Sequence, residues 1–122
     1  MGFVKRLLQA TINSWHGLIA CAQTEAAFRE ELVLLAAGVP LAFYLTSNIG
    51  ERFALIGSLV FVLIIELLNT AIEKLADRVT RDTDPLIKRV KDMGSAAILL
   101  SLLLAGAVWI WIAAERFWPA AG

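Results

Sequence analysis

The sequence is poor in the residues that build disulfide frameworks and metal clusters. Its 122 residues include one cysteine, Cys21, and one histidine, His16. A single cysteine excludes a disulfide within the chain and suits a reducing compartment, and a single histidine has no second one to complete a histidine metal cluster. The known soluble nucleotide motifs are also missing: a glycine-rich phosphate loop, a dinucleotide fingerprint and a kinase catalytic loop. Any nucleotide chemistry must therefore use another scaffold.

Apolar residues are abundant. They make up 59% of the chain, with a mean hydropathy of +0.73, which is far too apolar for a soluble domain of this size. The segments 53–72 and 93–114 have 20 and 22 residues, or about 30 and 33 Å of helix, enough to cross a bilayer core of roughly 30 Å. A shorter segment reaches sufficient length, about 26–47, if it kinks at Pro40. The sequence therefore predicts an all-α integral membrane protein with three transmembrane helices.

The basic residues are unevenly placed although the net charge is zero. Six of them lie between the second and third spans, whereas Arg52 and Arg116 alone mark the other side. By the positive-inside rule, the N-terminus and the second connection are cytoplasmic and the C-terminus faces outward. A basic loop beside a membrane is explained by this topology, so nothing requires a nucleic acid partner.

The first 24 residues form a distinct amphipathic segment. Apolar residues such as Phe3, Leu7 and Leu18 can share one face of a helix, with Lys5 and Gln9 elsewhere. This pattern favours a helix lying on the membrane surface, 1–24; a soluble helix packed on the bundle is the alternative.

A polar stripe enters the second span. Glu66 lies in the apolar run 61–68, where a carboxylate costs roughly 2.5–3.5 kcal/mol to insert. Asn69, Glu73 and Asp77 follow at spacings of three, four and four, which places all four residues on one helical face. Three helices provide little surface from which one chain could build a core of its own. We therefore expect an oligomer that shields this stripe from lipid. The small residues Ala97, Ser101 and Ala105 allow close approach of a neighbouring helix, or are ordinary small-residue filler.

The predicted cytoplasmic edge gathers carboxylates from several helices beside a lysine. Its members are Glu25, Glu30, Glu31, Glu73, Asp77, Lys91 and Asp92. Carboxylate oxygens suit magnesium and an ammonium suits phosphate, so a nucleotide site is one interpretation, and solvated helix ends are the other. A small channel lined by Glu66 is a further alternative, since intramembrane acids occur in such proteins.

Three separated segments resemble a known family. They are Glu25 to Arg29, Glu66 to Glu73 with Asp77-Arg78, and Lys91 to Ala97. Their amino-acid sequences, order and spacing resemble those of the signature segments of the prokaryotic membrane diacylglycerol kinases, and the resemblance covers nearly the whole chain. The resemblance implies a single membrane kinase domain, 1–122, in a homotrimer in the bacterial inner membrane. It also implies that ATP and Mg²⁺ are used to phosphorylate diacylglycerol to phosphatidate, in active sites between subunits near the cytoplasmic surface.

The same resemblance assigns roles to individual residues. Glu66 would be the general base, with Asn69 orienting the reacting groups beside it, and Glu25 and Glu73 would hold the metal with the ATP phosphates. The matched nucleotide contacts are Arg6, Lys91, Asp92 and the loop residues Asp82, Thr83 and Asp84. The matched lipid-pocket positions are Ser14, Trp15, Glu31 and Ser95.

Two positions are informative when this chain is compared with members of the family that it resembles. An aromatic position that helps to cover the nucleotide in the best-known members is Asn13 here. A branch of the same fold phosphorylates undecaprenol, but its third motif usually lacks the sequence Met-Gly-Ser found here at Met93 to Ser95. We therefore expect diacylglycerol as the acceptor.

Overall fold

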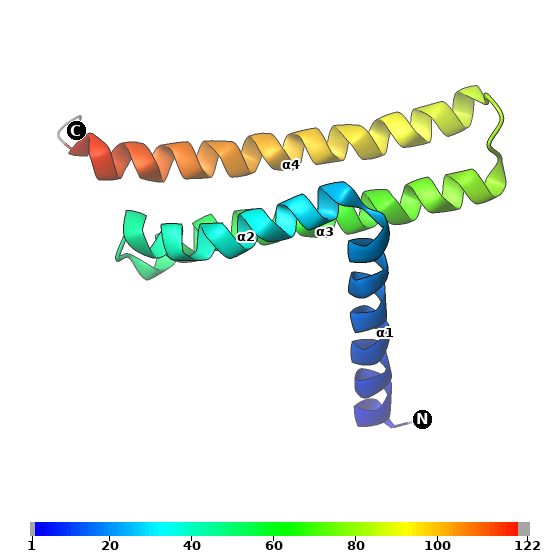
Figure 1. The fold of residues 1–122 in the computed structure, drawn as a ribbon, viewed down its shortest axis with the longest axis horizontal. Helices are drawn as coiled ribbons and strands as arrows, with labels where there is room; N and C mark the ends of the chain where they lie inside the picture. The colour runs from blue at the N-terminus through cyan, green and yellow to red at the C-terminus, as the bar shows by residue number, and fades with distance from the viewer. Residues whose placement is uncertain (1, 120–122) are drawn as a thin grey trace.

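The computed structural model describes residues 2–119 and contains four helices. They are α1 (Phe3–Thr24), α2 (Ala26–Leu45), α3 (Ile49–Val79) and α4 (Pro85–Phe117). α2 and α4 run antiparallel to α3 along its length, and α1 projects steeply away from this bundle (Figure 1). The predicted helix 1–24 is present from Phe3; Met1 lies outside the described residues.

Local sequence signals explain where the helices begin and end. Glu25 has an extended backbone that separates α1 from α2. The Asn48 side chain accepts a hydrogen bond from the Glu51 backbone N–H at 2.9 Å and caps α3. Asp84 caps α4 in the same way, directly before Pro85, whose fixed φ suits the first turn of a helix.

Two of the helices, α3 and α4, are long and apolar enough to cross a membrane. Both extend beyond the predicted spans 53–72 and 93–114. α2 is helical through Pro40, but its first two turns carry Arg29, Glu30 and Glu31, so its character as a third span stays a prediction.

Close packing between α3 and α4 explains the small residues of α4. Gly94, Ser101 and Ala105 are buried. Gly94 lies against Asn69 of α3, and Ala105 lines a cavity together with residues of α2 and α3, so neighbours in the same chain account for these two small residues. A Trp109 indole N–H donates to the Leu55 carbonyl and to the Ser58 hydroxyl, both at 3.1 Å, and so joins the two helices across their apolar part.

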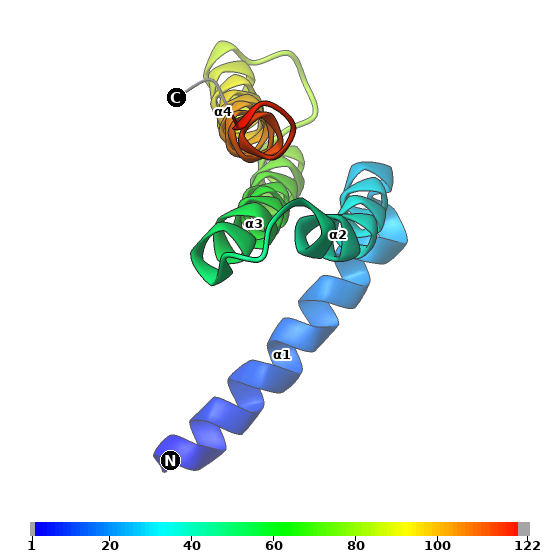
Figure 2. The ribbon, with the colours of Figure 1, turned by 90° about the vertical axis from the view of Figure 1, so that its left-hand side faces the viewer.

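Two apolar clusters hold the bundle together, one toward each end. Ala42, Leu45, Leu55 and Ile112 form the first. Cys21, Phe28 and Leu63 form the second, which fastens the end of α1 and the start of α2 to α3. The rest of α1 is exposed, and its direction away from the bundle is also visible in Figure 2.

Candidate active site

The polar stripe of α3 lies partly against α4, where Asn69 is beside Gly94; the region formed by Glu66, Asn69 and Glu73 is called the groove below. Glu66 and Asn69 are each only 8% exposed. Asn69 Nδ2 donates a hydrogen bond of 3.0 Å to Glu73 Oε1, one helical turn further on. The predicted spacing therefore places an acid, an amide and a second acid on one partly buried face.

Gly94 of α4 makes room for Asn69. A Cβ at position 94 would collide with Asn69 Oδ1, so glycine at position 94 lets the Asn69 side chain keep its present position. Asn69 Oδ1 is buried and has no hydrogen-bond partner among residues 2–119. A buried acceptor without a partner costs about 1–3 kcal/mol, and it is suited to a donor or cation from outside the chain.

Acidic residues from other elements surround this groove. The charge of Glu66 is repelled by the charges of Glu73 and Glu25, and that of Glu31 is repelled by Glu66. Glu25 comes from the junction of α1 and α2 and Glu31 from α2, and Glu31 Oε2 is buried without a partner in the described chain. Mutual repulsion of this kind is relieved by a cation or by protonation.

The donor set fits magnesium only in part. Oxygen ligands are the correct type for this ion, and an unpartnered buried oxygen is available. Within residues 2–119, however, no three acidic, histidine or cysteine side chains are arranged to hold a metal by themselves. A magnesium ion on Glu25 and Glu73 would need further oxygens, which phosphate groups and water provide.

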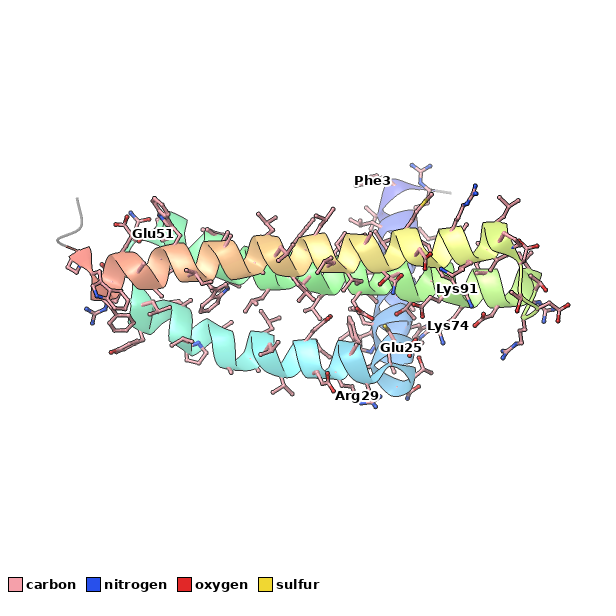
Figure 3. The ribbon with its side chains drawn as sticks, turned by 90° about the horizontal axis from the view of Figure 1, so that it is seen from above. Phe3, Glu25, Arg29, Glu51, Lys74 and Lys91 are labelled. Atoms are coloured by element: carbon pink, nitrogen blue, oxygen red, sulfur yellow. The ribbon has the colours of Figure 1, made fainter. Side chains whose placement is uncertain are left out.

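Basic residues stand at the same end of the bundle. Figure 3 shows Glu25, Lys74 and Lys91 there, far from Glu51 at the other end. Lys91 Nζ lies 2.7 Å from Asp77 Oδ1, and Lys88 Nζ lies 2.8 Å from Asp92 Oδ2. Asp77 lies beyond the apolar part of α3, and its hydrogen bond with Lys91 lowers the pKa of the Asp77 carboxyl. The Lys91 ammonium has three N–H donors and uses one of them on Asp77, so the others remain for a phosphate.

The predicted nucleotide residues of α1 are not brought to this groove within one chain. Arg6 and Asn13 are exposed, and Asn13 accepts a hydrogen bond of 3.1 Å from Gln9 on the same helix. Thr24 lies eighteen positions after Arg6, which is about 27 Å of helix directed away from the bundle (Figures 1 and 2). Arg6 therefore cannot reach Glu66 of its own chain.

The remaining predicted positions are distributed around the groove. Asp82 and Thr83 are exposed in the α3–α4 connection, and Ser95 is exposed on α4 beside Gly94. Asp84 accepts hydrogen bonds from Leu86 and Ile87 as the cap of α4, a structural role that the sequence analysis missed.

An apolar cavity of about 630 Å³ separates α1 from α3. Ser14 lines it, together with Cys21, Thr70 and Lys74, which the sequence analysis did not select. The buried Cys21 thiol lies 3.9 Å from the Thr70 hydroxyl, and burial raises the pKa of this thiol. Trp15 is exposed on the same helix, with 62% of its surface accessible. An apolar cavity beside a polar groove is suited to an amphipathic ligand.

The fold and this groove define a small helical membrane protein with an acidic site, flanked by lysines, at one end of its main helix pair. A family model for prokaryotic diacylglycerol kinase matches residues 12–113. The chain belongs to this family.

Named relatives agree with the family match. The chain is 43% identical over 106 residues to a diacylglycerol kinase of Pseudomonas aeruginosa, covering 87% of this chain and 86% of the relative. It is 41% identical over 104 residues to the Escherichia coli K12 diacylglycerol kinase, covering 85% of each. The Haemophilus influenzae diacylglycerol kinase is 37% identical over 103 residues, with 84% of this chain and 87% of the relative covered.

Proposed function

We propose that this protein transfers the γ-phosphate of ATP to the primary hydroxyl of diacylglycerol and releases phosphatidate and ADP, a reaction that recycles phospholipid. The buried Glu66, beside the Asn69–Glu73 hydrogen bond in the α3–α4 groove, is the observation that carries this proposal. The names of the relatives support diacylglycerol rather than undecaprenol as the acceptor.

In this proposal, the side chains position the reactants, accept the proton and neutralise the phosphate charge. The Glu66 carboxylate takes the hydroxyl proton while the lipid oxygen forms a bond to the γ-phosphorus and the bond to the ADP oxygen breaks. Asn69 holds the reacting groups beside Glu66. Lys91 contacts the phosphates and Asp92 contacts the nucleotide. Glu25 and Glu73 would hold a magnesium ion, which neutralises phosphate charge when bound.

The lipid is expected to enter beside α1. Ser14 and Trp15, with Glu31 and Ser95 nearer the groove, are proposed to contact the acceptor. The cavity at Ser14 and Thr70 supports this, because it is apolar and its α3 lining begins at Leu67, the residue after Glu66.

We infer that a complete site needs more than one subunit. The supporting observation is the distance of about 27 Å between Arg6 and the end of its own α1, which carries Arg6 and Asn13 away from the groove. A homotrimer with α1 on the cytoplasmic membrane surface, three spans per subunit and the C-terminus outward would let one subunit's Arg6 serve a neighbouring site. The loop residues Asp82, Thr83 and Asp84 would border the nucleotide in that assembly.

A lipid competition tests the reaction. Purified protein in mixed micelles, with labelled ATP and Mg²⁺, receives diacylglycerol and undecaprenol side by side. We expect labelled phosphatidate as the main product; labelled undecaprenyl phosphate in excess would reverse the assignment of the acceptor.

Subunit mixing tests the shared site. Co-expressed R6Q and E66Q chains should recover part of the wild-type activity, because a site in a mixed oligomer can combine the intact residues of both chains. No recovery in verified mixed oligomers would count against a shared site and would leave the lipid assignment standing.

A further inference from the structure

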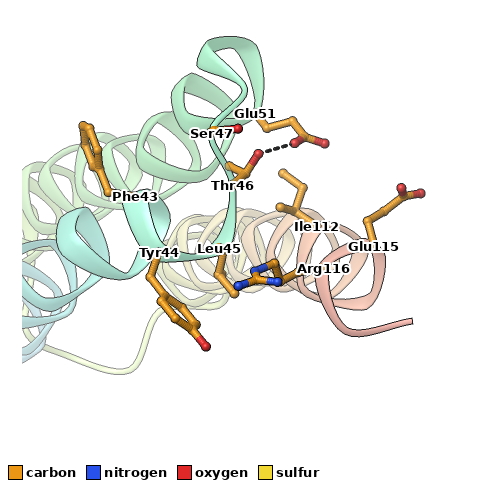
Figure 4. Close-up of a pocket in the computed structure, with 9 residues that line it drawn as sticks. All are labelled: Phe43, Tyr44, Leu45, Thr46, Ser47, Glu51, Ile112, Glu115 and Arg116. Carbon is orange, nitrogen blue, oxygen red and sulfur yellow. Dashed lines mark hydrogen bonds between the residues drawn. The ribbon is translucent and has the colours of Figure 1, made fainter. Parts of the chain in front are cut away.

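A second cavity opens at the opposite end of the bundle from Glu66. It has a volume of about 500 Å³ and lies between the last turn of α2, the first turn of α3 and the last turns of α4 (Figure 4). Its polar lining consists of Thr46, Ser47, Glu51, Glu115 and Arg116. This volume is within the roughly 300–1,000 Å³ range of small-molecule sites.

The charged side chains of this cavity are not paired with one another. Glu51 accepts a hydrogen bond of 2.5 Å from the Thr46 hydroxyl. Arg116 lies over the ring of Tyr44, 5.4 Å from its centroid. Within the part of the chain that the structure describes, neither Glu115 nor Arg116 takes part in a salt bridge. Figure 4 shows the Glu115 carboxylate directed away from the Arg116 guanidinium. Separate opposite charges in one cavity suit a ligand that carries both charges.

The neighbouring Arg52 is already used by the fold. Its Nε donates to the Thr46 carbonyl at 2.8 Å, and its guanidinium lies 4.2 Å from the centroid of Phe43. Within residues 2–119, Arg116 lies over the rings of Tyr44 and Phe117 but makes no hydrogen bond or salt bridge, so its N–H groups remain available for a ligand in this cavity.

Aromatic side chains place the cavity at the level of lipid headgroups. The exposed aromatic residues at this end include Phe43, Tyr44, Phe53, Trp111, Phe117 and Trp118. Such residues gather at membrane–water interfaces, where phospholipid headgroups lie.

We propose that this cavity binds a phosphoethanolamine group, a phosphate linked to a primary ammonium. Arg116 holds the phosphate, and Glu115 and Glu51 accept hydrogen bonds from the ammonium. A quaternary choline nitrogen has no N–H to donate, so this cavity selects against it. An uncharged glycerol headgroup leaves the two carboxylates without a cation. The ligand is therefore a headgroup of the ethanolamine class, from a membrane phospholipid or from a soluble phosphoethanolamine.

Thermal unfolding of the full chain in detergent micelles tests this site without use of kinase activity. The midpoint is titrated with short-chain phosphatidylethanolamine, phosphatidylcholine and phosphatidylglycerol, and with soluble phosphoethanolamine. We expect half-saturation at about tenfold lower concentration for the ethanolamine lipid than for the choline lipid, the size of one charge-assisted hydrogen bond. An equal response to soluble phosphoethanolamine identifies a soluble ligand, and a response to the lipid alone identifies the membrane source; both support the site.

Variants separate a specific site from general lipid effects. R116Q and, separately, E115Q should remove the preference for ethanolamine. R89Q is the matched control, because Arg89 is exposed on the opposite end of the same helix, and it should keep the preference. Equal half-saturation for all three lipids, or an unchanged preference in both R116Q and E115Q, overturns the proposal.

Discussion

The contact between Gly94 and Asn69 makes the replacement of Gly94 by alanine an informative perturbation. The new Cβ would collide with Asn69 Oδ1, which is the end of a side chain and can therefore move. Movement breaks the hydrogen bond from Asn69 to Glu73, at about 0.5–1.5 kcal/mol. Alanine is favoured over glycine within a helix by about 0.8–1 kcal/mol. The two effects nearly cancel, so we expect G94A to have a free energy of unfolding within about 1 kcal/mol of the wild type.

Activity should respond much more strongly than stability. A displacement of about 1 Å at a catalytic group can reduce the rate about 100-fold, and Asn69 is displaced whichever way the contact relaxes. We therefore expect the kcat of G94A for diacylglycerol to fall by at least about tenfold. The measurement is initial-rate phosphatidate formation in mixed micelles, alongside unfolding in the same detergent.

G106A is the matched control for this prediction. Gly106 lies on the same helix, and a Cβ there meets nothing within 4 Å. This variant should keep its activity and be equally or more stable than the wild type. If G94A were as active as G106A, the assignment of Asn69 to the reacting groups would be refuted.

Three further outcomes follow from other contacts. W109F removes the indole donor to Leu55 and Ser58 and should lower the free energy of unfolding by about 1 kcal/mol or more. W111F, at an exposed position, should not lower it. Equal stability of the two variants would contradict the role of this donor. D77N removes the partner of Lys91. Because Lys91 lowers the pKa of the Asp77 carboxyl, the difference in stability from wild type should be present above about pH 4 and disappear as the pH falls below it; a constant difference in unfolding titrations would argue against the ion pair. E73A should weaken magnesium dependence and nucleotide affinity together in kinetic titrations, and an unchanged magnesium titration would remove Glu73 from the metal site.

Periodicity within one helix was enough to predict much of this molecule. The apolar segments 53–72 and 93–114 lie inside α3 and α4, and the three- and four-residue spacing placed Glu66, Asn69 and Glu73 on one face. These features depend only on the geometry of a single helix, which the sequence specifies directly.

Features that depend on the register between helices were not predictable in this way. The approach of Gly94 to Asn69 and the pairing of Lys91 with Asp77 require α3 and α4 to be aligned along their lengths. The direction of α1 depends on the extended backbone at Glu25, and a helical pattern carries no information about the angle at which a helix leaves its neighbour. Asp84 illustrates the same limit, because the resemblance implied a nucleotide contact for it, while its position before Pro85 makes it the cap of α4.

The central claim is that the buried carboxylate of Glu66 removes the proton from the lipid hydroxyl. Comparison of E66Q with the exposed-site control E30Q tests it most directly, by measurement of both ATP binding and labelled phosphatidate formation in the same micelles. We predict that E66Q keeps its fold and binds ATP as the wild type does but loses turnover by at least about 100-fold, the contribution of a general base, while E30Q is unaffected. Near-normal turnover in E66Q would contradict this account of the site.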